Sequence, residues 1–112
     1  MEVKTAEKIL EASAFMSVGL DKLFVELSKI EDLKERKEFS PFVKDFLTGF
    51  YNFRDEIGNR HPDLHPDYLG IETYANMQQK FKLPDYPIAP PSQESIEKAI
   101  ALGIRMKNAR DK

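Results

Sequence analysis

The stretch that decides the fold comprises residues 39–58, FSPFVKDFLTGFYNFRDEIG. Ser40 is a good N-cap residue, and Pro41 suits the first helical turn because its missing N–H needs no partner there. Apolar side chains follow at steps of three and four, and this stripe comprises Phe39, Val43, Phe46, Phe50, Phe53 and Ile57. Gly58 then supplies a helix stop. We therefore predict a helix over residues 41–57 whose aromatic stripe dominates the core.

Gly49 lies inside this helix, where glycine is less favourable than other residues by up to about 1 kcal/mol. A glycine at such a position often marks the close approach of another backbone. We therefore expect another backbone to approach Gly49 closely.

The residues before this stretch contain no proline between positions 3 and 37, and they predict a helix over residues 3–36. One stripe at helical spacing comprises Ile9, Met16, Leu20, Leu23, Leu27 and Ile30. Phe15, Val18 and Val25 fall on the opposite side, so the middle of the helix is apolar nearly all round. Such a helix is either central in a bundle or shared with a second chain.

The length of this first helix is itself a constraint. A straight helix over residues 3–36 would span about 50 Å, whereas a compact domain of 112 residues has a radius of gyration of about 13 Å. The helix must therefore break or project towards a partner. The weak points are residues 17–19 and the charged run over residues 31–38.

The C-terminal half predicts two further helices, over residues 66–82 and 93–109. Four of the eight residues from Pro84 to Pro91 are proline, which excludes a helix there and predicts an extended strap that Tyr86 and Ile88 pin across helix ends. Together these elements predict an all-α fold: a single helical domain over residues 1–112, arranged like a four-helix bundle with a proline-rich extended strap before the last helix.

Composition removes several classes of function. The chain has no cysteine, which excludes disulfides, thiolate metal sites and cysteine nucleophiles. Its 17 basic and 19 acidic residues give a net charge of -2, which argues against a strongly electrostatic nucleic-acid binder. No glycine-rich phosphate loop is present, so we expect no cofactor and no enzymatic activity. No apolar run is long enough for a membrane span and no signal peptide is apparent, so we expect a cytoplasmic protein.

A tandem His-Pro-Asp sequence is the most conspicuous motif. It places His61, Asp63, His65 and Asp67 within seven residues, and imidazole with carboxylate suits several divalent metals. Each histidine precedes a proline, which disfavours a helical backbone and leaves the pair without a shared helical face. The simpler interpretation is two successive turns, and a metal-dependent enzyme or metal sensor is the alternative.

The C-terminal segment is basic. Its cations are Arg105, Lys107, Arg110 and Lys112. Cations favour a helix C-terminus in any protein, so this pattern needs no ligand. Weak nucleic-acid binding through the basic C-terminal helix is the other alternative.

The remaining signal is apolar surface without obvious cover. The residues concerned are Phe15, Val18 and Val25 of the first helix and Tyr86 and Ile88 of the strap. Aromatic and large apolar side chains are common at protein interfaces. We therefore expect a small non-enzymatic protein-interaction module, such as an adaptor, immunity or inhibitor protein, chaperone or regulatory subunit, whose partner is another protein or a second copy in a homodimer.

Overall fold

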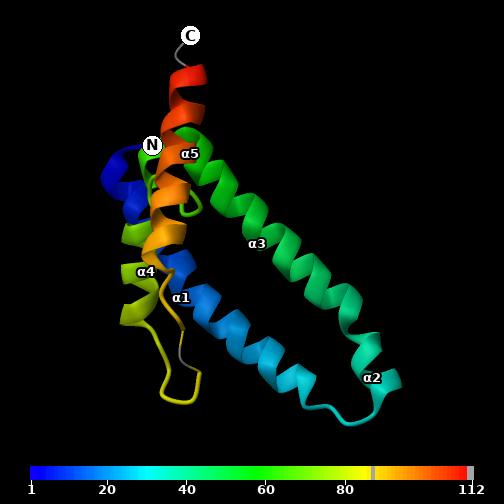
Figure 1. The fold of residues 1–112 in the computed structure, drawn as a ribbon. Helices are drawn as coiled ribbons and strands as arrows, with labels where there is room; N and C mark the ends of the chain where they lie inside the picture. Colours follow the sequence, from blue (N-terminus) through cyan, green and yellow to red (C-terminus); the bar gives the residue numbers. More distant parts are fainter. Residues whose placement is uncertain (87, 111–112) are drawn as a thin grey trace.

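The fold is all-α, as the sequence predicts (Figure 1). The computed structural model describes residues 1–86 and 88–110. Its helices are α1 (Val3–Ser28), α2 (Leu33–Glu38), α3 (Ser40–Arg60), α4 (Ile71–Lys80) and α5 (Gln93–Arg110), and a short 3-10 turn, η1 (Pro62–Leu64), follows α3. Among the described residues, no helix combines the length and apolar composition needed to cross a bilayer. The single-domain prediction includes residues 111–112, which lie outside the described residues.

The first helix ends earlier than the sequence predicts. It stops at Ser28, and a separate helix begins at Leu33, where one helix over residues 3–36 was expected. Asp32 is the N-cap of α2, and its Oδ1 accepts the backbone N–H groups of Lys34 at 2.9 Å and Glu35 at 3.2 Å. This cap satisfies the first N–H groups of a new helix, and the chain turns at residues 29–32, next to and partly within the charged run.

The turn makes α1 and α3 two arms of an elongated hairpin, with α2 at the far end (Figure 1). The molecule measures 53 × 28 × 28 Å, and its radius of gyration of 16.0 Å exceeds the roughly 13 Å of a compact domain of this length. We call residues 19–53 the hairpin arms. None of these residues, all of which the structure describes, is buried. Almost a third of the chain therefore lies outside the core.

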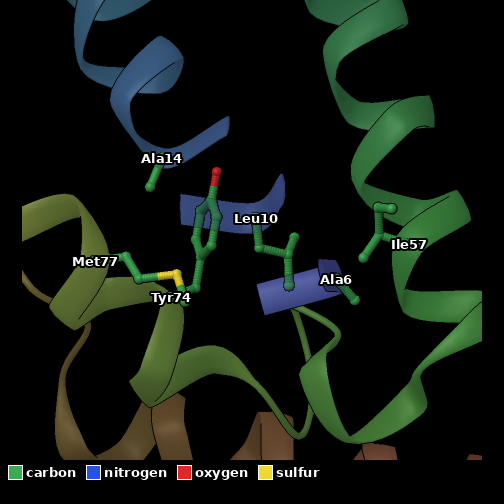
Figure 2. Close-up of a cluster of buried hydrophobic side chains, with 6 residues drawn as sticks. All are labelled: Ala6, Leu10, Ala14, Ile57, Tyr74 and Met77. Carbon is green, nitrogen blue, oxygen red and sulfur yellow. The ribbon is translucent and has the colours of Figure 1, made fainter. Parts of the chain in front are cut away.

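The core lies at the other end of the molecule, where α1 packs on α4 and on the last turns of α3 (Figure 2). Its buried apolar side chains are Ala6, Leu10 and Ala14 of α1, Ile57 of α3, and Tyr74 and Met77 of α4. Small residues on this face of α1 let α4 come close, and the Tyr74 hydroxyl lies 3.2 Å from Ser13 Oγ. Close approach of α1 and α4 therefore fixes the position of the core.

The prediction of which side of α1 faces inward is correct for Phe15 and Val25, which are exposed as expected, and wrong for three other residues. Val18, expected on the solvent side, has only 3% of its surface exposed. Met16 and Leu23, expected in the buried stripe, are exposed. The reason is that α4 packs on the small side chains of α1, and this contact rotates the large apolar stripe away from the core.

The prediction that the aromatic stripe of α3 dominates the core is also wrong. Ile57 at the C-terminal end of α3 is buried, but Phe39, Phe46 and Phe53 are exposed. Only the last turns of α3 reach the core, because the turn at residues 29–32 places the first half of this helix at the far end of the hairpin.

A turn over residues 65–70 delays the start of α4 to Ile71, five residues later than expected. The His65 carbonyl accepts the N–H groups of Tyr68 at 3.1 Å and Gly70 at 2.8 Å, which closes the turn. A Cβ atom at Gly103 of α5 would lie 2.8 Å from Leu69 Cγ. The last helix therefore rests directly on this turn at a glycine.

Residues 81–92 connect α4 to α5 without forming a helix in their described part. Tyr86 N–H donates to the Leu83 carbonyl at 3.1 Å, and Gln79 Nε2 of α4 donates to the Ile88 carbonyl at 2.8 Å. The Tyr86 hydroxyl bonds the Glu26 carboxylate of α1. These contacts tie the connection to α4 and to one hairpin arm. Pro87, which belongs to the predicted strap, lies outside the described residues.

Leu10→Ala should reduce the free energy of unfolding by about 2–5 kcal/mol, because Leu10 is almost completely buried in the core. Leu23→Ala removes the same atoms from an exposed position of the same helix and should cost less than about 1 kcal/mol. Urea denaturation followed by circular dichroism measures both. Equal costs at the two positions would contradict the inward face of α1 described above.

Candidate functional site

Exposed apolar side chains cover the hairpin and form the largest candidate site. Those between positions 15 and 53 are Phe15, Met16, Leu23, Val25, Leu33, Phe39, Phe42, Phe46, Tyr51 and Phe53. We call this set the arm surface. Single exposed apolar residues are ordinary, whereas contiguous apolar patches mark interaction sites.

Of the five residues expected to bind a partner, two belong to the arm surface. Phe15 is 62% exposed, although its ring packs edge-on against Phe81 at 5.2 Å, and Val25 is 41% exposed. Val18 is buried and is removed from the candidate site as a correction. Tyr86 and Ile88 are half-buried beside α1 and line a shallow groove together with Val25.

An open groove of about 550 Å³ separates the two arms. Its apolar lining comes from both helices and comprises Phe24, Leu27, Phe39, Val43 and Leu47. Well-packed interiors leave few voids larger than a water molecule, so this groove is a surface and not part of a finished core. The arms are apolar on the sides that face each other as well as on their outer sides.

Gly49 has an open environment within this chain. A Cβ atom built there would meet no heavy atom within 4 Å. No other segment of the described chain therefore packs against Gly49, and the expected close approach of another backbone stays a prediction.

The residues of the His-Pro-Asp tandem are separated by the fold. His65 and Asp67 lie with Asp55 of α3 in a group whose ligand atoms are all within 4.8 Å of one another. His61 and Asp63 lie outside this group, and Asp63 pairs with Lys107 of α5 at 3.1 Å. Sequence spacing missed Asp55 because the turn after α3 brings it back beside His65.

His65 uses both ring nitrogens within this group. The backbone N–H of Asp67 donates to Nδ1 at 3.1 Å, so the proton of the neutral ring lies on Nε2, which is 3.2 Å from Asp55 Oδ1. The ring also packs directly on Gly58, where a Cβ atom would lie 2.0 Å from His65 Cδ2. This arrangement fixes the turn to the end of α3.

Arg54 is the strongest buried charge that sequence reasoning missed. It is 7% exposed, and its guanidinium lies 2.9 Å from Asp67 Oδ1. Three aromatic rings surround it, with centroids 4.8 Å away for Tyr74, 5.3 Å for Tyr51 and 5.7 Å for Phe50. A lone arginine within an aromatic stripe was the available signal, since guanidinium stacks favourably on such rings.

A polar network continues from Arg54 along the contact of α1 with α4. Ser13 lies beside the Tyr74 hydroxyl, and Gln78 Nε2 donates to Ser17 Oγ at 3.1 Å, which gives Gln78 the partner a buried amide requires. Burial raises the pKa of the Tyr74 hydroxyl above its ordinary value, while the bond to Ser13 and the charge of Arg54 act in the opposite direction. These polar contacts join the small-residue face of α1 to α4.

The basic C-terminal helix is partly committed to contacts within the chain. Besides the Lys107–Asp63 pair, Arg110 donates to the Asn59 carbonyl at 3.3 Å. Lys112 lies outside the described residues. Cations at the end of α5 therefore attach it to the end of α3, and nucleic-acid binding through them stays a prediction.

Comparisons of this chain with protein-family models, with curated proteins and with solved structures give no match.

Tyr74 should make stability fall at alkaline pH. Because its pKa is raised in the folded state, its contribution is fully present below about pH 10, where the unfolded tyrosine is protonated, and is lost as pH rises through the folded pKa. Tyr74→Phe should therefore be less stable than the native chain at pH 8, and this difference should shrink by pH 11. Urea denaturation at both values measures it, and a difference that grows with pH would contradict the direction of the shift.

Proposed function

We propose that this chain is a non-enzymatic protein-interaction module that binds another polypeptide through the arm surface. The supporting observation is that residues 19–53, although rich in large apolar side chains, contain no buried residue. At roughly 25 cal/mol for each Å² of apolar surface removed from water, covering these side chains is a substantial driving force for association.

The four-helix-bundle-like arrangement expected from the sequence would form only when a partner is bound. One chain leaves an apolar groove open between its arms, and helices of a partner packing on the arms would complete a bundle. The connection near Tyr86 and Ile88 acts as the strap that holds one arm in place, since Tyr86 bonds Glu26 and the Lys22 ammonium lies 5.6 Å from its ring.

The polar groups that could perform acid–base chemistry support a structural role. His65 Nδ1 accepts the Asp67 N–H, His65 Nε2 lies 3.2 Å from Asp55 Oδ1, and Asp67 is paired with Arg54. These contacts join α3 to the turn before α4, which positions the base of the hairpin.

Phe15→Glu combined with Val25→Glu should abolish partner binding without unfolding the chain, because both side chains are exposed and a charge there prevents burial at an interface. The measurement is affinity purification from native cells, with a second, differently tagged copy of the chain co-expressed. A polypeptide retained in stoichiometric amount by the native chain should be lost by this variant.

Leu102→Glu with Ile104→Glu is the matched control. It places two charges at exposed apolar positions of α5, away from the arms, and should retain the partner. If no retained polypeptide depends on Phe15 and Val25, and thermal melting shows the variant to be folded, the α1 side of the arm surface is not the interaction site.

A metal site is the second candidate, because three possible ligands converge at Asp55, His65 and Asp67. Two features oppose it: the Arg54 cation lies 2.9 Å from Asp67 Oδ1, and His65 Nδ1 already accepts the backbone N–H of Asp67. We expect one equivalent of Zn²⁺ to leave the melting temperature of the native chain unchanged. A rise that is lost in His65→Ala and kept in His61→Ala would establish the metal site instead.

A further inference from the structure

One side of α3 carries an exposed apolar seam at heptad spacing, and its first residue, Phe39, also lines the groove between the arms. The seam comprises Phe39, Phe42, Phe46, Gly49 and Phe53, at successive steps of three, four, three and four. Phe42 is 60% exposed, Phe46 53% and Phe53 46%, and space around Gly49 is open. Steps of three and four are the pattern by which two helices pack knobs into holes. The seam is therefore built to receive another helix.

The last four residues of this seam have the same spacing in both chain directions. From Phe42 to Phe53 the steps are four, three and four, so an antiparallel copy of α3 presents the same pattern. A two-fold axis between Phe46 and Gly49 places Phe46 of each copy opposite Gly49 of the other. It also places Phe42 opposite Phe53. The large ring then faces the one seam position without a side chain, which gives Gly49 the close neighbour that it lacks within a single chain.

The charges on α3 permit two identical surfaces to meet. A two-fold interface brings like residues of the two copies near the axis, so charges in the seam would repel. From Ser40 to Phe53 the only charged residues are Lys44 and Asp45, of opposite sign, and neither belongs to the seam. The arms as a whole carry six basic and seven acidic residues between positions 19 and 53, so they are nearly neutral.

The exposed area of the chain fits a stable dimer. Its accessible surface is 7917 Å², whereas a compact monomer of 12.9 kDa exposes about 6,300 Å². The excess is about 1,600 Å². Obligate homodimers bury about 1,000–2,500 Å² on each chain. A second copy seated along the arms would thus cover roughly the surface by which this chain exceeds a compact monomer.

We propose that two copies of this chain associate through antiparallel α3 helices, with Phe46 of each copy packed against Gly49 of the other. This proposal rests on the proposed function and names the partner of the arm surface as a second copy of the chain. The dimer would join two hairpins side by side along α3, with the cores at opposite ends.

Gly49→Gln separates the dimer from the monomer by opposite effects. In one chain the new side chain enters open space and improves helix propensity, by up to about 1 kcal/mol. Against a second copy it collides with the Phe46 ring. Sedimentation equilibrium at tens of micromolar should show the native chain as a dimer and Gly49→Gln as a monomer. The dimer dissociation constant of the variant should be at least tenfold larger than that of the native chain.

Gly19→Gln is the matched control for this substitution. Gly19 also lies within a helix, on α1, and has no neighbouring atom within 4 Å of its Cβ position. This variant should remain a dimer. A native chain that sediments as a monomer, or a dimer equally sensitive to both substitutions, would overturn the proposal.

Cysteine pairs test the antiparallel register even if Gly49→Gln fails to fold. The native chain has no cysteine, so Phe42→Cys with Phe53→Cys introduces the only thiols. These positions are about 16 Å apart along one helix, too far for a disulfide within the chain. Mild oxidation should produce a disulfide-linked dimer on a non-reducing gel.

Thr48→Cys with Asn59→Cys has the same spacing on a different side of α3 and should not cross-link at the same rate. Equal cross-linking of both pairs, or none of the Phe42 and Phe53 pair in a dimeric protein, would overturn the antiparallel α3 contact. If the native chain is monomeric but loses a different polypeptide on Phe15→Glu with Val25→Glu, self-association is wrong and the interaction function stands.

Discussion

The contact between the small-residue face of α1 and α4 is the constraint on which the rest of the structure depends. Ala6, Ser13 and Ala14 allow Tyr74 and Met77 to reach the helix axis closely, and the core forms there. Once this face is committed to α4, the large apolar side chains of α1 must point elsewhere. The fold thus places its core near one end of a long molecule and leaves most aromatic residues of α3 exposed along the hairpin.

The hairpin follows from this commitment and from the turn at residues 29–32. The turn reverses the chain after Ser28, so α3 runs back beside α1 and joins the core only through its last turns, near Arg54 and Ile57. The side chains between the arms do not fill the space that separates them. An apolar surface of this extent is stable in water only at a cost, and a second polypeptide is the simplest cover for it.

The His-Pro-Asp tandem has a clear structural role at the base of the hairpin. His65 packs on Gly58 and pairs with Asp55, while Asp67 holds the buried Arg54. These contacts join α3 to the turn that precedes α4, and Gly103 of α5 rests on the same turn. A motif that resembles a ligand set is thereby used to connect three helices. The same contacts fix the position of the base of the hairpin, from which the two arms extend.

Local patterns in the sequence determined the helical class, the helix from Ser40, the helix after the prolines and the excess of apolar surface, because propensity and periodicity are short-range effects. The expected N-cap at Ser40 and helix stop at Gly58 are wrong, since both residues lie inside α3, which runs from Ser40 to Arg60 and has no side-chain cap at its N-terminus. The helical spacing of Phe39, Phe42, Phe46 and Phe53 can also be seen in the sequence alone. Only the tertiary structure decided which of these side chains are covered. Val18 is buried and Phe46 exposed because burial depends on which helix packs on a given face, and α4 packs on the small side chains of α1. Asp55 joined His65 for a similar reason, since a turn brings together residues that no sequence spacing relates.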